Sequence, residues 1–196
     1  MRQETLTPVY VRISHWINAI AVILMVMSGL KIYNASPVFN FLIPRSITLG
    51  GWLGGALLWH FAVMWLLVFN GILYLFANIY SGRMKKKFFP IRATELVNDF
   101  IDSLKGKLTH DDLSKYNSIQ KLAYLAAIAD LILIIASGLV IWKSVQFPIL
   151  RELLTGFDHA RVIHFLAMCF IVFFLFIHLI MVALVPKTLL IMLRGR

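Results

Sequence analysis

Charged residues are scarce in this chain, and acidic residues are the scarcest. Of its 196 residues only 9 are Asp or Glu and 19 are Lys or Arg, so charged residues make up 14% of the sequence while hydrophobic residues make up 60%. Soluble domains carry roughly 25% charged residues, and a mean hydropathy of +0.83 is too apolar for such a domain. The composition excludes a soluble domain and predicts an integral membrane protein.

Cysteine is also almost absent, which excludes a disulfide framework. The single cysteine, Cys169, lies among Met, Phe and Ile residues within a long apolar run. One cysteine cannot form an intrachain disulfide, and nothing around it in the sequence indicates thiol chemistry. We interpret Cys169 as a packing residue.

Four stretches are long and apolar enough to cross a bilayer, at residues 13–33, 51–80, 118–142 and 160–185. They leave too little sequence for a second folded domain, so we expect one transmembrane domain over the whole chain. The basic start before the first span resembles a signal peptide, but cleavage after that span would discard His15, and we treat it as an uncleaved anchor. The predicted fold class is an all-α membrane protein with a bundle of four transmembrane helices.

The basic residues predict the orientation of this bundle. If the four spans alternate in direction, one side of the membrane carries fourteen of them: Arg2, Arg12, Arg83, Lys85, Lys86, Lys87, Arg92, Lys105, Lys107, Lys115, Lys121, Lys187, Arg194 and Arg196. The other side carries five, namely Lys31, Arg45, Lys143, Arg151 and Arg161. Because cytoplasmic segments are rich in Lys and Arg, we expect both termini in the cytoplasm of a bacterium and the spans in its inner membrane. The net charge of +10 then reflects topology and contact with anionic lipid, not nucleic-acid binding.

The connection between the second and third spans has an apolar pattern at helical spacing. Within residues 91–107 the apolar positions are Leu96, Val97, Phe100, Ile101 and Leu104. A helix with one apolar face lies in the membrane interface, so we expect a short amphipathic helix on the cytoplasmic surface that either floats there or docks a partner. Asn117 or Ser118 offers an N-cap for the third span.

Two histidines of the fourth span, His164 and His178, are fourteen residues apart. At about 100° and 1.5 Å per residue they share one helix face and lie roughly 21 Å apart along the axis. His15 falls in the inner half of the first span, at the depth of His178, and His60 falls in the outer half of the second span, at the depth of His164. The spacing predicts two pairs, His15 with His178 and His60 with His164, and no ligand from the third span.

Paired imidazoles inside a four-helix bundle suit axial ligation of haem iron. A lone histidine in a membrane is equally well explained by an interhelical hydrogen bond, but four at matching depths indicate two buried metal groups, because ionisable side chains are costly in lipid. We therefore predict two haems b, an inner one held by the first pair and an outer one held by the second. His159 lies off the shared face and His110 lies in the basic connection, so neither is assigned to a site.

Three glycines and two arginines are predicted to complete the haem sites. Gly29 and Gly138 face the outer site and Gly71 the inner one, where a missing side chain makes room for a macrocycle, although small residues also serve ordinary helix packing. Arg12 and Arg161 each precede a ligand by three residues, at opposite surfaces. They either bind haem propionates or snorkel to the lipid headgroups.

Asp130 stands alone near the middle of the third span. A carboxyl group at that depth is costly, so it calls for a specific role. It is either a protonated helix–helix hydrogen-bond partner, which we favour, or part of a proton path to a quinone.

Several runs of the sequence form a recognisable set. They are residues 12–16 (Arg-Ile-Ser-His-Trp), the Ser-Gly-Leu runs at 28–30 and 137–139, His60, and the pair His164 and His178. Together they resemble the prokaryotic cytochrome b561 and nickel-iron hydrogenase b-type cytochrome subunits, a family that includes formate dehydrogenase and thiosulfate reductase gamma-type subunits. Residues 115–124 are similar to a subgroup that accompanies periplasmic molybdopterin oxidoreductases.

The resemblance implies an electron-transfer subunit rather than a complete enzyme, which links a periplasmic redox partner with the quinone pool through the two haems. Histidine on both faces of each haem argues against oxygen binding at iron. Arg12, His15, Gln120 and Tyr124 are candidate neighbours of a quinone at the cytoplasmic side. The alternatives are a stand-alone quinone-linked superoxide oxidase, a histidine-lined divalent-metal transporter and a plain membrane anchor for a peripheral enzyme.

Overall fold

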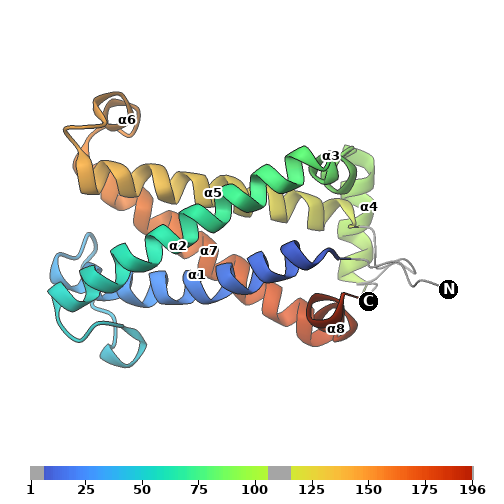
Figure 1. Ribbon diagram of the computed structural model, residues 1–196, viewed down its shortest axis with the longest axis horizontal. Coiled ribbons are helices and arrows are strands. Elements are labelled where there is room, and N and C mark those ends of the chain that lie inside the picture. Colours follow the sequence, from blue (N-terminus) through green and yellow to red (C-terminus); the bar gives the residue numbers. More distant parts are fainter. Residues whose placement is uncertain (1–6, 106–115, 196) are drawn as a thin grey trace.

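The long apolar stretches form helices, and the connections between them add short ones. The computed structural model describes residues 7–105 and 116–195. Its helices are α1 (Val9–Ala35), η1 (Arg45–Ile47), α2 (Leu53–Tyr80), α3 (Arg83–Phe88), α4 (Ala93–Leu104), α5 (Ser118–Lys143), α6 (Pro148–Leu153), α7 (Phe157–Leu184) and α8 (Lys187–Arg194). No strand occurs in the described ranges, so the predicted all-α class is confirmed (Figure 1). The predictions for Arg2, Lys107, His110, Lys115 and Arg196 fall outside the described residues.

The four predicted spans correspond to α1, α2, α5 and α7, each long and apolar enough to cross a membrane. Their ends differ from the predicted bounds by at most four residues. α1 starts early, directly after Pro8, whose ring fixes a backbone angle that suits a helix start. α7 also starts early, after Gly156, whose φ of 103° favours glycine. The first and fourth spans therefore begin four and three residues before their predicted bounds.

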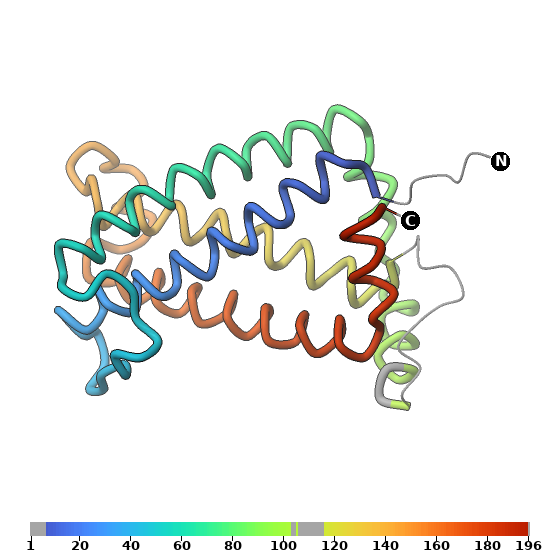
Figure 2. Tube along the Cα trace, turned by 60° about the horizontal axis from the view of Figure 1, so that its bottom comes forward, coloured from blue at the N-terminus to red at the C-terminus, as the bar shows by residue number. Residues whose placement is uncertain are grey.

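The four long helices form two antiparallel hairpins. α1 packs along α2 and α5 packs along α7, whereas the hairpins touch each other at few positions (Figures 1 and 2). In the first hairpin Ala21, Val63 and Leu67 form a buried cluster. Only 11% to 22% of the residues in the most apolar part of each span are buried. Most apolar side chains of the spans are therefore not enclosed within the protein, as expected for a bundle that is surrounded by lipid.

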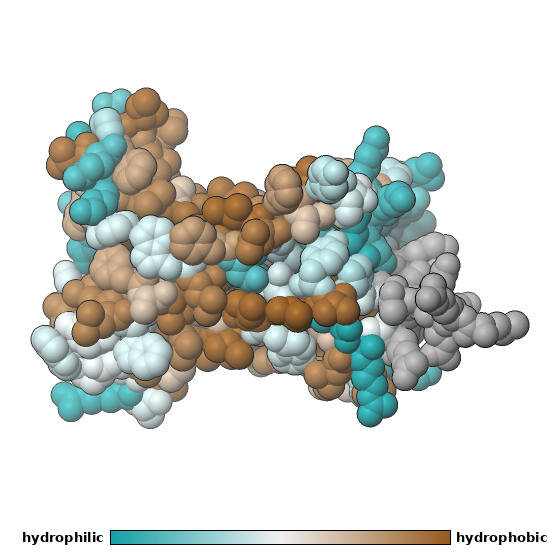
Figure 3. All heavy atoms as spheres, viewed as in Figure 1, coloured by the Kyte–Doolittle hydropathy of each residue, from teal (hydrophilic) through white to brown (hydrophobic). Residues whose placement is uncertain are grey.

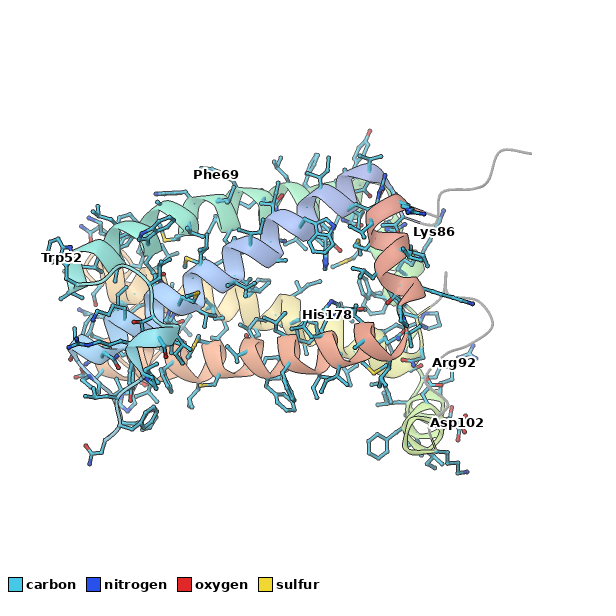
Figure 4. All side chains as sticks on the ribbon, turned by 90° about the horizontal axis from the view of Figure 1, so that it is seen from below. Trp52, Phe69, Lys86, Arg92, Asp102 and His178 are labelled. Atoms are coloured by element: carbon cyan, nitrogen blue, oxygen red, sulfur yellow. The ribbon has the colours of Figure 1, made fainter. Side chains whose placement is uncertain are left out.

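Polar residues gather at the two ends of the bundle and leave an apolar belt between them (Figure 3). Both termini lie at one end together with α3, α4 and α8, and we call it the terminal end (Figure 1). The loop with η1 and the short helix α6 lie at the opposite end, which we call the distal end. Lys86 and Trp52 mark these two ends in Figure 4. The chain is a multi-pass membrane protein, and the start of α1 and the end of α8 lie at the same end of its bundle.

α4 lies beside the terminal end of the bundle and is held there by its acidic side chains (Figure 4). The backbone N–H of Ser118 donates to Asp99 Oδ2 at 2.6 Å, and the Ser118 hydroxyl donates to Glu95 Oε2 at 3.4 Å. Val97, Phe100 and Ile101 are large apolar side chains of α4 that are exposed. A helix is thus present where the sequence predicts one, and its location at the membrane surface stays a prediction.

The predicted N-cap of the third span is confirmed at Asn117. Its side-chain oxygen accepts from the Gln120 backbone N–H at 2.7 Å, and Gln120 Oε1 accepts from the Asn117 N–H at 3.2 Å. This reciprocal capping box satisfies two backbone donors at the start of α5. The Gln120 side chain, a predicted quinone neighbour, is therefore engaged in capping the helix.

Candidate haem-binding sites

The structure brings the four transmembrane histidines together in the two predicted pairs. His15 on α1 approaches His178 on α7, with ring centroids 6.0 Å apart. His60 on α2 approaches His164 on α7, with ring centroids 6.4 Å apart. Figure 4 shows His178 on the side of α7 that faces the other helices. As predicted, α5 contributes no histidine to either pair.

The separation within each pair fits a metal ion held between two imidazoles. A metal–nitrogen bond is about 2 Å long and the ring centroid lies about 1 Å beyond the nitrogen, so two imidazoles on opposite sides of one ion have centroids roughly 6 Å apart. Within residues 7–105 and 116–195, no group of three or more His, Cys, Asp or Glu side chains could hold a metal ion. Donors that come only in pairs suit a haem, whose macrocycle supplies the other four ligands of the iron.

His164 is held by the neighbouring helix of its own hairpin. Its Nδ1 lies 3.0 Å from the Ile134 carbonyl oxygen and 3.0 Å from Ser137 Oγ. A carbonyl oxygen only accepts hydrogen bonds, so Nδ1 carries the ring proton. The Ser137 hydroxyl donates to the Leu133 carbonyl oxygen at 2.8 Å, which leaves its lone pairs to accept from His164. The other ring nitrogen, Nε2, therefore keeps a lone pair for a metal.

His60 is held in the same way in the other hairpin. Its Nδ1 lies 3.1 Å from Ser28 Oγ, and the backbone of Met25 lies near enough to interact electrostatically with the ring. The Ser28 hydroxyl donates to the Leu24 carbonyl oxygen at 2.7 Å. In both hairpins a serine hydroxyl contacts the Nδ1 atom of a histidine, and the backbone of the residue three positions before that serine lies near the same ring. We call this arrangement, with the glycine after the serine, the α1 cradle (Met25, Ser28, Gly29) and the α5 cradle (Ile134, Ser137, Gly138).

The cradle glycines give room to the histidine rings. A Cβ atom on Gly29 would lie 3.4 Å from His60 Cε1, and one on Gly138 would lie 3.3 Å from His164 Cε1. Both glycines therefore lie beside the rings of the His60 and His164 pair, and their expected contact with a macrocycle stays a prediction. At Gly71, predicted to face the inner site, a Cβ would meet no atom within 4 Å.

The inner pair is held by ring contacts. His15 meets the edge of Trp16 with centroids 5.4 Å apart, and His178 stacks on Phe174 at 6.0 Å with an angle of 17° between the rings. Neither imidazole hydrogen-bonds to another residue in the part of the chain that the structure describes. The two pairs therefore differ in their surroundings, because only the outer pair has cradles.

A buried polar cluster beside the inner pair joins α1 to α2. The Asn70 amide donates to the Ser14 carbonyl oxygen at 2.9 Å and to Asn18 Oδ1 at 2.7 Å. The Ser14 hydroxyl donates to Asn70 Oδ1 at 3.1 Å. Because Ser14 precedes His15, this cluster fixes the rotation of α1 that turns the His15 ring toward α7.

The two arginines predicted to bind propionates both contact the backbone. Arg161 donates to the carbonyl oxygen of Ser36 and, at 3.0 Å, to its hydroxyl, which joins the start of α7 to the end of α1. Arg12 donates to the Leu193 carbonyl oxygen at 2.8 Å. Its Nε is buried and has no hydrogen-bond partner among the described residues. An unpaired buried donor is costly, so Arg12 is the better of the two candidates for binding an anion at its site.

Three other polar residues named from the sequence lie outside the two pairs. Asp130 Oδ2 is buried without a hydrogen-bond partner in the described ranges, so the predicted interhelical hydrogen bond is not found there. His159 is exposed, and its Nδ1 lies 3.0 Å from the Thr155 carbonyl oxygen. The interpretation of Cys169 as a packing residue is wrong, because its side chain is exposed on α7.

A series of aromatic rings leads from the inner pair toward the terminal end. Phe174, which stacks on His178, meets Tyr124 with centroids 6.1 Å apart, and Tyr124 meets Tyr116 at 5.1 Å. Burial raises the pKa of the Tyr116 phenol, although the nearby Arg83 opposes this shift. Its hydroxyl is therefore protonated and able to donate at neutral pH. Tyr124, a predicted quinone neighbour, belongs to this series.

Sequence reasoning missed the residues that position the histidines. Ser28, Ser137 and Asn70 are all buried, and each hydrogen-bonds across its hairpin. The available signal was the repeated Ser-Gly-Leu run in the first and third spans. The sequence alone assigns the glycines of that run to the outer site, with ordinary helix packing as the alternative, and gives its serines no role.

The comparisons with known proteins identify a family of membrane cytochromes. A family model described as prokaryotic cytochrome b561 matches residues 6–195. A protein of Azospira oryzae, described provisionally as the protein-methionine-sulfoxide reductase subunit YedZ1, is 60% identical over 188 residues, which cover 96% of this chain and 95% of the relative. The comparison with solved structures gives no match. The chain belongs to the prokaryotic cytochrome b561 family and is a membrane-spanning b-type cytochrome that serves electron transfer.

Proposed function

We propose that this cytochrome moves electrons across the bacterial inner membrane, between the quinone pool and a periplasmic oxidoreductase, by means of two haems. The observation that carries the proposal is the placement of two histidine pairs along α7. His164 and His178 lie at two depths of that helix, and each faces a histidine of another helix. One helix thus supplies a ligand to each of two sites.

The histidines have separate roles in this scheme. His15 and His178 would hold the inner haem, and His60 and His164 would hold the outer one. Haem iron, when bound, supplies a one-electron couple between its ferric and ferrous states. Because a histidine occupies each face, these residues leave no open position for oxygen and suit outer-sphere electron transfer.

The length of α7 sets how far the two sites reach across the membrane. The fourteen-residue step between His164 and His178 corresponds to roughly 21 Å along the helix. The apolar core of a bilayer is about 30 Å thick, so two sites at this spacing bring each haem close to one membrane surface. A single site could not reach both sides.

The partner that we propose is taken from the name of the Azospira oryzae relative, which is described as a subunit of a protein-methionine-sulfoxide reductase. We infer that a periplasmic protein-methionine-sulfoxide reductase subunit docks at the distal end and that it is molybdopterin-dependent. Reducing a methionine sulfoxide to methionine and water consumes two electrons and two protons. Electrons would therefore run from quinol to the inner haem, then to the outer haem and to the partner. The terminal end, which carries most of the basic residues, faces the cytoplasm in this scheme.

Haem content and four histidine variants test the proposal. We expect a pyridine haemochrome assay of the purified protein to find about two haems b per chain. His60→Ala and His164→Ala should each remove the outer haem, His15→Ala and His178→Ala the inner one, and the exposed His159→Ala neither. A protein with less than one haem would refute the scheme, and a protein without a Soret band would favour the transporter. If His60→Ala and His178→Ala remove the same haem, the pairing is wrong.

A further inference from the structure

The two hairpins are related by an approximate two-fold rotation that the contacts reveal. The α1 cradle holds His60 on α2, and the α5 cradle holds His164 on α7, so α1 corresponds to α5 and α2 corresponds to α7. A separate set of contacts has the same register. Tyr33 lies five residues after the serine of the α1 cradle, and Trp142 lies five residues after the serine of the α5 cradle, so these two residues correspond. Phe61 and Phe165 correspond as well, because each directly follows the histidine that a cradle holds.

These corresponding aromatic residues make corresponding contacts between the hairpins. Tyr33 stacks on Phe165 with centroids 4.6 Å apart, which joins α1 to α7. Phe61 contacts Trp142 with centroids 5.3 Å apart, which joins α2 to α5. The residue correspondence derived from the cradles therefore also describes the contacts between the hairpins at the distal end. His60 and His164 correspond to each other, so the outer pair lies on the rotation axis.

The inner pair lies off this axis, and the rotation predicts a counterpart for it. His15 comes thirteen residues before Ser28, and Tyr124 comes thirteen residues before Ser137. His178 comes fourteen residues after His164, and the residue fourteen after His60 is Tyr74. The place that His15 and His178 occupy between α1 and α7 is thus occupied by Tyr124 and Tyr74 between α5 and α2.

The two tyrosines have the surroundings of a binding site. The Tyr124 hydroxyl is within electrostatic range of the Tyr74 and Tyr116 hydroxyls. Neither the Tyr74 nor the Tyr124 hydroxyl hydrogen-bonds to any residue that the structure describes. Neither hydroxyl oxygen is fully enclosed by the surrounding protein, so these two donors border accessible space. Phenol groups donate hydrogen bonds, and quinone carbonyl oxygens accept them.

We propose that Tyr74 and Tyr124 form the site for the quinone head group. This inference rests on the proposed function and specifies where the quinone binds. Phe174 contacts Tyr124 on one side and stacks on His178 on the other, so the site adjoins the inner haem ligand. Oxidation of a quinol here would release two electrons, one at a time toward the inner haem, and two protons toward the nearby terminal end. The outer haem and the periplasmic partner accept the electrons.

Conservative variants test this site with decylubiquinone as the probe. Tyr74→Phe and Tyr124→Phe remove one hydroxyl each and keep the ring. We expect each to raise the dissociation constant of decylubiquinone about three- to tenfold, the loss that one hydrogen bond predicts, and to slow haem reduction by decylubiquinol at limiting concentration. The control is Tyr80→Phe on the same helix, whose side chain is 86% exposed. Unchanged haem spectra in all three variants would show intact folding.

The outcomes separate this site from the proposed function as a whole. If the wild-type protein binds decylubiquinone and is reduced by its quinol, but both variants behave like the wild type, the tyrosine site is wrong and the function stands. If no quinol reduces the wild-type haems, the proposed function itself is wrong. A third haem that is lost in Tyr74→Phe or Tyr124→Phe would also overturn the quinone site, because the tyrosines would then belong to a haem site.

Discussion

Removing the hydroxyl of a cradle serine should weaken the outer haem site and leave the inner one unchanged. Ser28→Ala takes an acceptor away from His60 Nδ1, which lies 3.1 Å from Ser28 Oγ, and leaves the Met25 backbone near the ring. One hydrogen bond of this kind contributes about 1 kcal/mol. Loss of a hydrogen-bond partner behind a metal ligand costs about 10- to 100-fold in affinity. Because the Met25 backbone still interacts with the ring, we expect the lower end of this range, about a tenfold weaker binding of the outer haem.

The same variant should raise the midpoint potential of the outer haem. A hydrogen bond donated from Nδ1 makes the imidazole a better electron donor, which favours ferric iron. If that bond is stronger by about 0.5 kcal/mol in the ferric state, its loss raises the potential by about 20 mV, since a tenfold change in a one-electron equilibrium corresponds to about 59 mV. Ser137→Ala should act in the same direction through His164.

A redox titration of the purified protein, followed in the haem absorption bands, measures this shift for each haem. The double variant Ser28→Ala, Ser137→Ala should raise the potential further than either single variant, because each serine would act through a different histidine of the same site. Ser81→Ala is the matched control, since the Ser81 hydroxyl donates to the Asn78 carbonyl oxygen at the end of α2 and to no other residue within 7–105 and 116–195. A shift confined to the inner haem, or a fall in the outer potential, would refute the reasoning.

Two further changes test the packing around the sites. Gly138→Ala should have little effect, because its Cβ would lie 3.3 Å from His164 Cε1 and the ring can give way by a few tenths of an ångström, whereas Gly138→Val should displace the ring and remove the outer haem from the absorption spectrum. Asn70→Leu should destabilise the α1–α2 hairpin by about 1–2 kcal/mol, since it removes all the hydrogen bonds between Asn70 and α1. Thermal unfolding checks this second result, and an unchanged melting temperature would contradict it.

The spans and the histidine pairing were predictable because an α-helix has regular geometry along its length. The rise and rotation per residue fix the depth and face of His164 and His178 once the span is known. The cradles were not predictable in this way. Which ring Ser28 meets depends on how α1 is rotated against α2, and that rotation is set by contacts between residues far apart in the sequence, such as Asn70 with Ser14.

The surface arginines show a related limit of sequence reasoning. Spacing places Arg161 near the outer surface, but its partner is the end of α1 at Ser36, 125 residues away in the chain. The short helices α6 and α8 were also missed, because a helix of six or eight residues has too few turns for its apolar periodicity to stand out. In both cases the deciding contacts are tertiary.

The approximate two-fold relation between the hairpins explains why two kinds of site occur at the inner depth. A site on the axis receives equivalent residues from both hairpins, as His60 and His164 show, so a change in one half has to remain compatible with the other. A site off the axis has a counterpart whose residues can change independently. His15 with His178 and Tyr124 with Tyr74 occupy two such places. On this interpretation the same helix pairing gives one place to a fixed one-electron carrier and the other to an exchangeable two-electron carrier, and Phe174 lies between them.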